Sequence, residues 1–399
     1  MRPMKDSGIA WLGQVPSEWQ VERLQWYVRE VKESNNPIKT TQVLSLTNNR
    51  GVIPYEEKGA QGNVAKEDYS QYKVAYPNTI IANSMNILIG SVGMCVYYGC
   101  VSPVYYVYKI LDTADIRFIN YIFQTVQFQK ELRKYANGIL EIRLRVTSAD
   151  ILKRKIAIPP LAEQQAIADY LDEKCAAIDK LIDNQKAQIE KMKEYKQSVI
   201  TEAVTKGLNP SVPMKDSGIY NIGIIPKGWN VERIKRFLEI CNGKEVQSDD
   251  GEIPVYGSGG IFKYTDRAIY DGESILFGRK GTIDKPILVK GVFWTVDTMF
   301  YTKGIHDIII KYLYYCCIGL IDYQFYKSGS VLPSMTQSEL GNVIVTIPPL
   351  AEQQAIADYL DEKCAAIDKL IAIKQAKIDK LNDYKKSLIY EYVTGKREV

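Results

Sequence analysis

Residues Ile158 to Ile182 read IPPLAEQQAIADYLDEKCAAIDKLI, and the same 25 residues recur without a change from Ile347 to Ile371. The proline pairs Pro159-Pro160 and Pro348-Pro349 suit the start of a helix but not its interior. No further Pro or Gly follows until Gly207 in the first copy and Gly395 in the second. Each copy therefore predicts an uninterrupted helix of ~44 residues, ~66 Å long at ~1.5 Å per residue.

An apolar stripe runs along each predicted helix in alternating steps of three and four residues, the pattern of a coiled-coil seam. Its members are Cys175, Ile178, Ile182, Ile189 and Met192 in the first helix and Cys364, Ile367, Ile371, Ile378 and Leu381 in the second. Gln185, Lys196, Lys374 and Lys385 place polar residues in this seam, and such residues usually fix register or orientation. Two matching stripes predict that the helices pair antiparallel, with one variable domain at each end. Amphipathic helices packed only on their own domains are the alternative.

A second repeat opens each half of the chain. MKDSGI occurs at Met4 and at Met214, and P-x-x-W-x-V-E-R follows at Pro16 and at Pro226. This offset is 210 residues, whereas the helix repeat has an offset of 189, so the first variable region is 21 residues longer. The pattern indicates a tandem duplication of one domain-plus-helix module, which can imitate a two-fold homodimer. We therefore divide the chain into a variable domain (1–157), a constant helix (158–208), a second variable domain (209–346) and a second constant helix (347–399).

The variable domains are expected to be of mixed α and β structure, which makes the whole chain α+β. Strands are predicted where β-branched and aromatic runs are bounded by Gly, Pro and Asn turns. These runs are Thr79–Ala82, Cys95–Tyr98, Val104–Ile110, Ser274–Phe277, Pro286–Val289 and Val292–Thr295. Helices are predicted at Ile116–Tyr135 and Ile308–Leu320.

The composition argues against catalysis by this chain. Among 399 residues there is a single histidine, His306, so histidine-dependent triads and histidine-rich metal sites are hard to assemble. The seven cysteines form no C-x-x-C pair, and no G-x-x-x-x-G-K-[ST] segment is present. We expect no metal and no cofactor on the chain. No apolar run approaches ~20 residues and the N-terminus lacks a signal-peptide core, so a cytoplasmic protein with no membrane association is expected.

The net charge of +4 is mild, but its distribution is uneven. The four blocks carry net charges of +6, −2, 0 and 0 in chain order, so the excess lies in the first variable domain. Eight of its 20 basic residues crowd into 26 positions, with Lys130, Lys134, Arg143 and Arg145 among them. Arg143 and Arg145 alternate with apolar residues after an Asn-Gly turn, so both would project from one side of an extended segment and suit phosphates or guanine edges. A solvated charged face is the alternative for any one of them.

Turn positions supply the other candidates for nucleic-acid contact. Asn83 and Asn86 follow the predicted strand Thr79–Ala82. Arg279 and Lys280 stand in a Gly-flanked turn that could enter a groove, although a charged hairpin tip is an equal alternative. Ser258 and Gly259 lie in the segment YGSGG, where a tight turn is expected and a backbone contact with phosphate is possible.

These motifs resemble one family, the specificity subunits of type I restriction-modification systems. The doubled I-P-P-L-A-E-Q-Q at Ile158 and Ile347, the W-x-V-E-R opening of each half, the P-V-Y-G-S-G-G segment from Pro254 and the G-x-V-S-P-x-Y segment from Gly99 carry the resemblance, which covers essentially the whole chain. It implies that the variable domains are target recognition domains, each reading one half of a bipartite, asymmetric site in double-stranded DNA. It also implies that the helices set the spacer between the half-sites and dock two methyltransferase subunits.

In this family the methyltransferase subunit uses S-adenosylmethionine to methylate adenine, and a restriction subunit adds ATP-dependent translocation and cleavage. Both activities would therefore belong to partners, and this chain would be a non-catalytic recognition subunit. Two other functions remain open on the sequence alone: a scaffold that joins partners without binding DNA, and a DNA enzyme with an unrecognised catalytic site.

Overall fold

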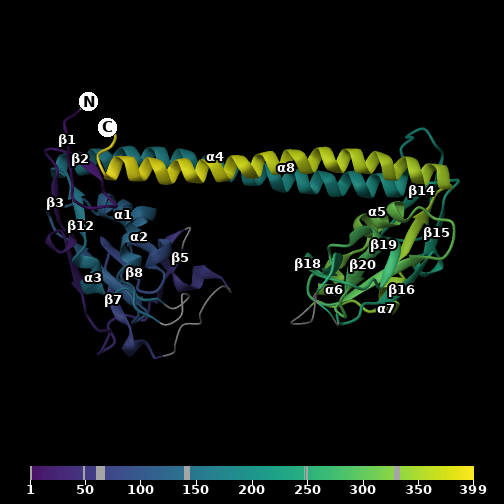
Figure 1. The fold of residues 1–399 in the computed structure, drawn as a ribbon, viewed down its shortest axis with the longest axis horizontal. Coiled ribbons are helices and arrows are strands. Elements are labelled where there is room, and N and C mark those ends of the chain that lie inside the picture. Colours follow the sequence, from purple (N-terminus) through teal and green to yellow (C-terminus); the bar gives the residue numbers. More distant parts are fainter. Residues whose placement is uncertain are drawn as a thin grey trace. The chain divides into compact units, whose positions relative to one another are not determined.

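The computed structural model describes residues 2–47, 50–59, 68–138, 144–246, 248, 250–327 and 333–399. The chain divides into two compact units. Unit 1 consists of Met1–Asn184 together with Lys377–Val399, and unit 2 consists of Gln185–Ala376. Each unit thus contains one variable domain and a part of each long helix (Figure 1).

Two long helices confirm the main prediction from the repeat. Helix α4 spans Leu161–Lys206 with 46 residues, and helix α8 spans Leu350–Val393 with 44 residues. Both begin directly after a Pro-Pro pair, where the missing N–H of proline is tolerated. In unit 1, Asp179 of α4 accepts a hydrogen bond from Nζ of Lys385 of α8 at 2.7 Å. The rings of Tyr170 and Tyr392 lie 4.6 Å apart.

Unit 2 repeats this pairing. Nζ of Lys196 in α4 lies 2.6 Å from Asp368 in α8, and Lys374 donates to Gln188. Within each unit the residue numbers in α8 fall as those of their partners in α4 rise, so the helices run antiparallel within each unit. The pairs Lys196–Asp368 and Lys385–Asp179 are related by the 189-residue offset of the repeat.

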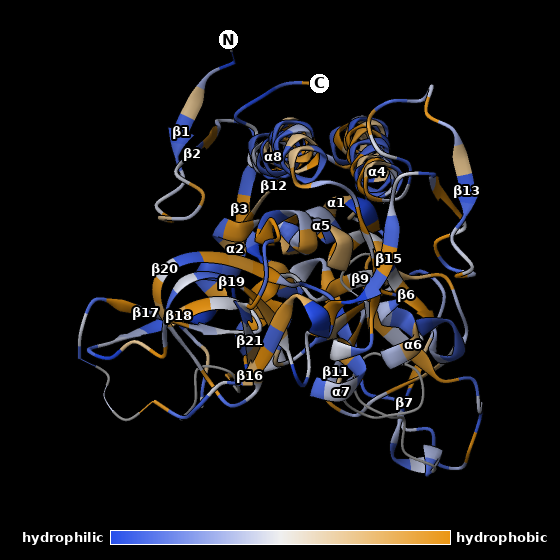
Figure 2. Cartoon of the chain, turned by 90° about the vertical axis from the view of Figure 1, so that its right-hand side faces the viewer, coloured by the Kyte–Doolittle hydropathy of each residue, from blue (hydrophilic) through white to orange (hydrophobic). Residues whose placement is uncertain are grey.

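The apolar seam of these helices is largely buried. Seven of its side chains are 5–8% exposed: Cys175, Ile178, Ile182, Ile189, Cys364, Ile367 and Ile378. Met192, Ile371 and Leu381 are half-buried. Figure 2, which looks along the two long helices, shows both to carry mixed hydrophilic and hydrophobic residues, whereas strand β20 (Ile287–Thr295) is largely hydrophobic.

The variable domain of unit 1 is built on a four-stranded antiparallel sheet in the order β4-β11-β8-β9. These strands are β4 (Val28–Val31), β8 (Thr79–Asn83), β9 (Val92–Cys95) and β11 (Tyr105–Ile110). Among the described residues of this domain, four two-stranded ribbons accompany the sheet: β1 (Met4–Asp6) with β2 (Gln14–Pro16), β3 (Gln20–Arg23) with β12 (Lys155–Ile158), β5 (Leu44–Thr47) with β6 (Gly51–Pro54), and β7 (Lys73–Ala75) with β10 (Gly99–Val101). Its helices are α1 (Ile116–Gln124), α2 (Val126–Arg133) and α3 (Ser148–Leu152).

The variable domain of unit 2 has a six-stranded sheet in the order β16-β21-β19-β20-β17-β18, with β17 and β20 parallel and the other neighbours antiparallel. The strands are β16 (Leu238–Asn242), β17 (Ile253–Gly257), β18 (Gly260–Thr265), β19 (Tyr270–Gly278), β20 and β21 (Met299–Gly304). Two ribbons pair β13 (Met214–Asp216) with β14 (Ile224–Pro226) and β15 (Asn230–Arg233) with β22 (Ile344–Ile347). The helices are α5 (Ile310–Leu320), α6 (Tyr323–Lys327) and α7 (Gln337–Gly341).

The two domains share one plan beneath these differences. The order β4-β11-β8-β9 corresponds to β16-β21-β19-β20, and α1 corresponds to α5. In each unit, Figure 1 shows α1 or α5 beside the long helices, with the sheet on its far side. Among the described residues, the hairpin β17–β18 is hydrogen-bonded into its sheet through β20, whereas the hairpin β5–β6 packs against β9 as a separate ribbon.

Most predicted elements are present, with shifted ends. The predicted strand Cys95–Tyr98 is wrong beyond Cys95, where β9 ends. The predicted helix Ile116–Tyr135 is two helices, because Thr125 leaves the helical region at φ −71° and ψ 132° and caps α2 with its side chain. The two predicted strands Pro286–Val289 and Val292–Thr295 are one strand, β20, continued through Gly291.

Within the described ranges, no helix is both long enough and apolar enough to cross a membrane. The same residues contain no group of three or more His, Cys, Asp or Glu side chains placed to hold a metal ion.

Candidate nucleic-acid interface

Each variable domain is held on its constant helix by a buried tryptophan. Nε1 of Trp19 donates to both carboxylate oxygens of Glu163 at 3.2 Å. Nη1 of Arg2 forms an ion pair with Oε1 of the same carboxylate at 2.6 Å. In unit 2, Nε1 of Trp229 donates to Glu352 at 2.9 Å. The two tryptophans belong to the W-x-V-E-R motifs and the two glutamates to the A-E-Q-Q motifs, so the constant sequence motifs bind each other.

The glutamine after each of these glutamates binds the start of the first α-helix of its variable domain, α1 or α5. The Gln164 side chain accepts from the backbone N–H of Asp115, the N-cap of α1, and donates to the carbonyls of Thr113 and Pro159. Gln353 likewise accepts from the N–H of Ile309, the N-cap of α5, and donates to the carbonyl of Pro348.

A tyrosine on each domain helix completes this attachment. The hydroxyl of Tyr121 donates to Asp172 at 2.7 Å, and that of Tyr315 donates to Asp361 at 2.7 Å. Burial and the carboxylate partner raise the pKa of both phenols well above their usual range, so both stay protonated donors. We call Glu163, Gln164 and Asp172, with their equivalents Glu352, Gln353 and Asp361, the docking residues.

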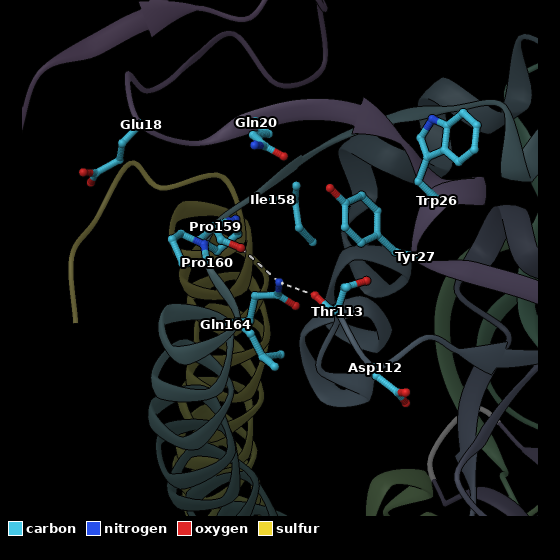
Figure 3. Close-up of a pocket in the computed structure, with 11 residues that line it drawn as sticks. Glu18, Gln20, Trp26, Tyr27, Asp112, Thr113, Ile158, Pro159, Pro160 and Gln164 are labelled. Carbon is cyan, nitrogen blue, oxygen red and sulfur yellow. Dashed lines mark hydrogen bonds between the residues drawn. The ribbon is translucent and has the colours of Figure 1, made fainter.

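A groove of about 660 Å³ lies beside this attachment in unit 1 (Figure 3). Figure 3 shows Gln164 between Pro159 and Thr113, with Tyr27 beside Ile158 and Trp26 at the rim. The indole of Trp26 is 60% exposed. Counted from the W-x-V-E-R motif, Arg236 takes its place in unit 2, so the repeat does not duplicate this aromatic rim.

Strands β8 and β19 are equivalent inner strands of the sheets in the two domains. At the carboxyl end of β8, Asn83 pairs with Tyr105 at the start of β11. At the same end of β19, Gly278 pairs with Met299 at the start of β21. A returning segment also reaches each end, because the N–H of Val146 donates to the carbonyl of Ser84 and that of Met335 to the carbonyl of Arg279. The turns after β8 and β19 are therefore equivalent positions, and four of the candidate residues occupy them.

In unit 1, three candidates gather at this end of β8. Asn83 is 8% exposed and Asn86 is exposed, and both line one cavity. Arg145 is exposed and forms a backbone bridge with Asn137 in the returning segment, one residue before Val146. Arg143 lies outside the described residues.

The two lysine candidates lie on the neighbouring helix. Lys130 is exposed on α2, and Lys134 at the end of α2 forms a 2.6 Å ion pair with Glu131. Helix α2 packs on the short turn Ile87–Ile89, which directly follows Asn86. The lysines are therefore one element away from the end of β8.

In unit 2, Arg279 and Lys280 are both exposed in the turn after β19. Lys280 bridges Ser334 of the returning segment. A Cβ at Gly278 would collide with the carbonyl of Thr282, so this turn requires glycine. Ser258 and Gly259 form the tip of the β17–β18 hairpin, the tight turn that the sequence predicts. This hairpin adjoins β20 and is a separate feature from the turn after β19.

Sequence reasoning missed two features. Strand β18 exposes Ile261, Phe262 and Tyr264 at 48%, 59% and 50%, which the aromatic spacing of IFKYT could have indicated. The bonds between the Trp and Glu motifs were also missed. Both motifs survive in two otherwise divergent domains at two different offsets, which indicates that they contact each other.

The family described as "Type I restriction modification DNA specificity domain" matches residues 16–191 and 226–383. The putative type I restriction enzyme MjaX specificity subunit of Methanocaldococcus jannaschii is 22% identical over 97% of this chain and 96% of its own. The MjaVIII specificity subunit of the same organism is 24% identical over 96% and 94%.

The fold is shared with a solved chain from a study entitled "Structural basis underlying complex assembly and conformational transition of the type I R-M system". That chain superposes with a TM-score of 0.72 at 14% identity, over 95% of this chain and 98% of its own.

Proposed function

Because the chain belongs to the type I restriction-modification DNA specificity family, and is therefore a non-catalytic DNA-recognition subunit, we propose that its two variable domains each read one half of a bipartite, asymmetric DNA site. The turn after β8 reads the first half-site and the turn after β19 reads the second. Asn83, Asn86 and Arg145 would contact the first half, with Lys130, Lys134 and Arg143 supplying charge to its phosphates. Arg279 and Lys280 would contact the second half, with backbone contacts from Ser258 and Gly259.

One observation carries this proposal. Asn83 with Asn86, and Arg279 with Lys280, lie in two divergent domains at the same end of the equivalent strand of a shared sheet plan. Arginine and asparagine are the side chains that read guanine and adenine edges bidentately, and exposed lysines suit phosphates. The side chains differ between the two turns, which fits two different half-site sequences.

We also propose that the long helices dock two adenine-methyltransferase subunits and, through them, restriction subunits. Most of the seam side chains are buried, so the partner would meet other residues. Leu181 and Tyr384 are 47% and 53% exposed in unit 1, and their repeat equivalents Leu370 and Tyr195 are 48% and 61% exposed in unit 2.

The surroundings of these exposed side chains are duplicated as well. Nζ of Lys174 lies 5.3 Å from the Tyr170 ring, and Nζ of Lys363 lies 5.7 Å from the Tyr359 ring. Lys174 and Leu181 are seven residues apart and so share one face of α4. Two equivalent apolar patches beside a cation suit two copies of one partner. S-adenosylmethionine, ATP and magnesium would bind to the partner subunits.

Genome-wide adenine methylation tests the recognition proposal. Deleting the gene should abolish methylation at one bipartite motif, and the wild-type gene should restore it. Arg145→Ala should relax the motif in one half only, and Arg279→Ala should relax the other half only. Each lost base contact should cost about 1–3 kcal/mol of discrimination. An unchanged motif in both variants would remove these two arginines from the readout. Absence of any bipartite motif would refute the proposed function.

A further inference from the structure

A cavity of about 300 Å³ lies at the carboxyl end of β8 in unit 1. Tyr55, Tyr72 and Tyr105 line it together with Asn83 and Asn86. Lys58 also lines it, with Nζ 5.3 Å from the centre of the Tyr55 ring. The volume is at the lower end of the range for small-molecule sites. Flat aromatic walls beside amide groups favour a flat polar ring as the ligand.

Asn83 presents an unpartnered donor to this cavity. Its side chain is 8% exposed, and its Oδ1 accepts from the backbone N–H groups of Met85 at 3.0 Å and Asn86 at 3.4 Å. These two donors fix the orientation of the amide, so Nδ2 is the atom left to face the cavity. Nδ2 has no hydrogen-bond partner among the described residues. Since Nδ2 is not one of the fully buried unpaired atoms, it is open to the cavity and can donate a hydrogen bond to a ligand there.

We propose that this cavity binds a single nucleobase of the target DNA, held beside the tyrosine rings with an acceptor atom on Nδ2 of Asn83. The proposal rests on the proposed function, since it assumes that the first variable domain reads DNA. Extruded bases are held in this way by stacking and by hydrogen bonds to the base edge. The positive charge of Lys58 suits the phosphate that enters with the nucleotide.

Unit 2 does not repeat this cavity chemistry. The position equivalent to Asn83 is Gly278, which has no side chain, and Arg279 follows it. The first half-site would therefore be read partly by enclosing a base, and the second by cations at an open turn.

Asn83→Asp is the sharpest variant, because it keeps the Oδ1 acceptor that holds the turn and replaces only the Nδ2 donor. It also adds a negative charge, so it needs a charge-matched control. Asn78→Asp adds the same charge at the opposite end of β8, in a turn where Asn78 has φ 59°, a conformation that Asp tolerates. A thermal unfolding midpoint equal to that of the wild-type chain in both variants would establish that the fold is intact.

The experiment uses the complex of the full chain with its methyltransferase subunit and duplexes carrying the methylated site. Each base of the first half-site is removed in turn, leaving an abasic nucleotide, and affinity is measured for the wild-type, Asn83→Asp and Asn78→Asp complexes. We expect one position at which base removal weakens wild-type binding about tenfold or more. At that position base removal should cost the Asn83→Asp complex nothing further, while the Asn78→Asp complex behaves as wild type.

A fluorescent analogue then tests whether that base leaves the stack. 2-Aminopurine replaces a purine at the coupled position, and pyrrolocytosine replaces a pyrimidine. Fluorescence should rise when the wild-type complex binds. Equal losses in the wild-type and Asn83→Asp complexes at every position would overturn the proposal, as would unchanged fluorescence. If the wild-type complex methylates a bipartite site in either case, only the cavity proposal fails and the proposed function stands.

Discussion

Lengthening both long helices by one heptad should lengthen the unread spacer of the DNA site. The insertions belong after Ala187 in α4 and after Ala376 in α8, which are equivalent positions of the 189-residue repeat. Seven residues add ~10.5 Å at ~1.5 Å per residue, and they turn the helix by only ~20° from an exact repeat of the seam. The apolar seam and the ion pairs Lys196–Asp368 and Lys385–Asp179 would therefore be preserved on each side of the insertions.

At ~3.4 Å per base pair, this extension corresponds to about three additional base pairs between the half-sites. The assay is adenine methylation across the genome in cells carrying the lengthened subunit. Both half-site sequences should stay the same while the spacer grows. Inserting the heptad in α4 alone is the control, because it breaks the match with α8 and should abolish methylation. Full methylation at the original spacer by the doubly lengthened subunit would refute the idea that the helices measure the site.

Three further predictions concern the docking surface, the helix seam and the core of unit 2. Leu181→Arg should leave one methyltransferase bound instead of two, as counted by native mass spectrometry, because burying a half-exposed leucine is worth about 1 kcal/mol and an arginine must be desolvated as well. Leu370→Arg should have the same effect at the other docking face. Two bound copies in the double variant would contradict the docking proposal. Ile178→Ala should lower the free energy of unfolding, measured with denaturant, by about 2–5 kcal/mol. Lys385→Ala, which removes a partly exposed ion pair, should lower it by no more than ~1 kcal/mol. A larger loss for Lys385→Ala than for Ile178→Ala would show that charge holds the helices together. Burial raises the pKa of Cys316 to about 12, so above pH ~9 the unfolded chain loses a proton that the folded chain keeps, and the free energy of unfolding should fall as pH rises. Cys316→Ala should reduce the slope of the unfolding free energy against pH by about 1.4 kcal/mol per pH unit. An equal slope in the wild-type and variant proteins would show that the Cys316 thiol does not cause the fall.

The repeat predicted the long helices well because their signal is long and periodic. Forty or more residues without Pro or Gly, with a seam that matches between the copies, leave few alternatives to a paired helix. The polar seam positions were informative too: Lys196 and Lys385 each pair with an aspartate of the other long helix. The aspartates could not be chosen from sequence, because many acidic residues lie on the outer faces of these helices.

The variable domains were harder to predict because their strands are short and their ends depend on tertiary contacts. Thr125 illustrates this, since nothing in the run from Ile116 to Tyr135 breaks a helix by composition, yet its hydroxyl caps a second helix there. The cavity beside Asn83 is a second example. Its walls come from residues between Val43 and Tyr105, which become neighbours only when β8 pairs with β11.

The position of the 25-residue identity has a structural reason. The docking residues all lie within it, and each makes the same kind of contact with two dissimilar domains. Beyond Ile182 and Ile371 the helices diverge, as Asp183 and Ala372 show, although the seam continues. A recent duplication alone would have left the rest of the helices equally similar.

A domain therefore fits either helix if it offers three features: the tryptophan of W-x-V-E-R, the N–H of a helix N-cap and a tyrosine on that helix. Both domains also place a cation four residues before the tyrosine, Arg117 in α1 and Lys311 in α5, and both cations contact the same aspartates of the constant helix as the tyrosines do. Residues four apart share one helix face, so this pair forms a single contact surface. Because the requirements for attachment are separate from the turns after β8 and β19, we expect that variable domains can diverge or be exchanged without disturbing the helices that carry them.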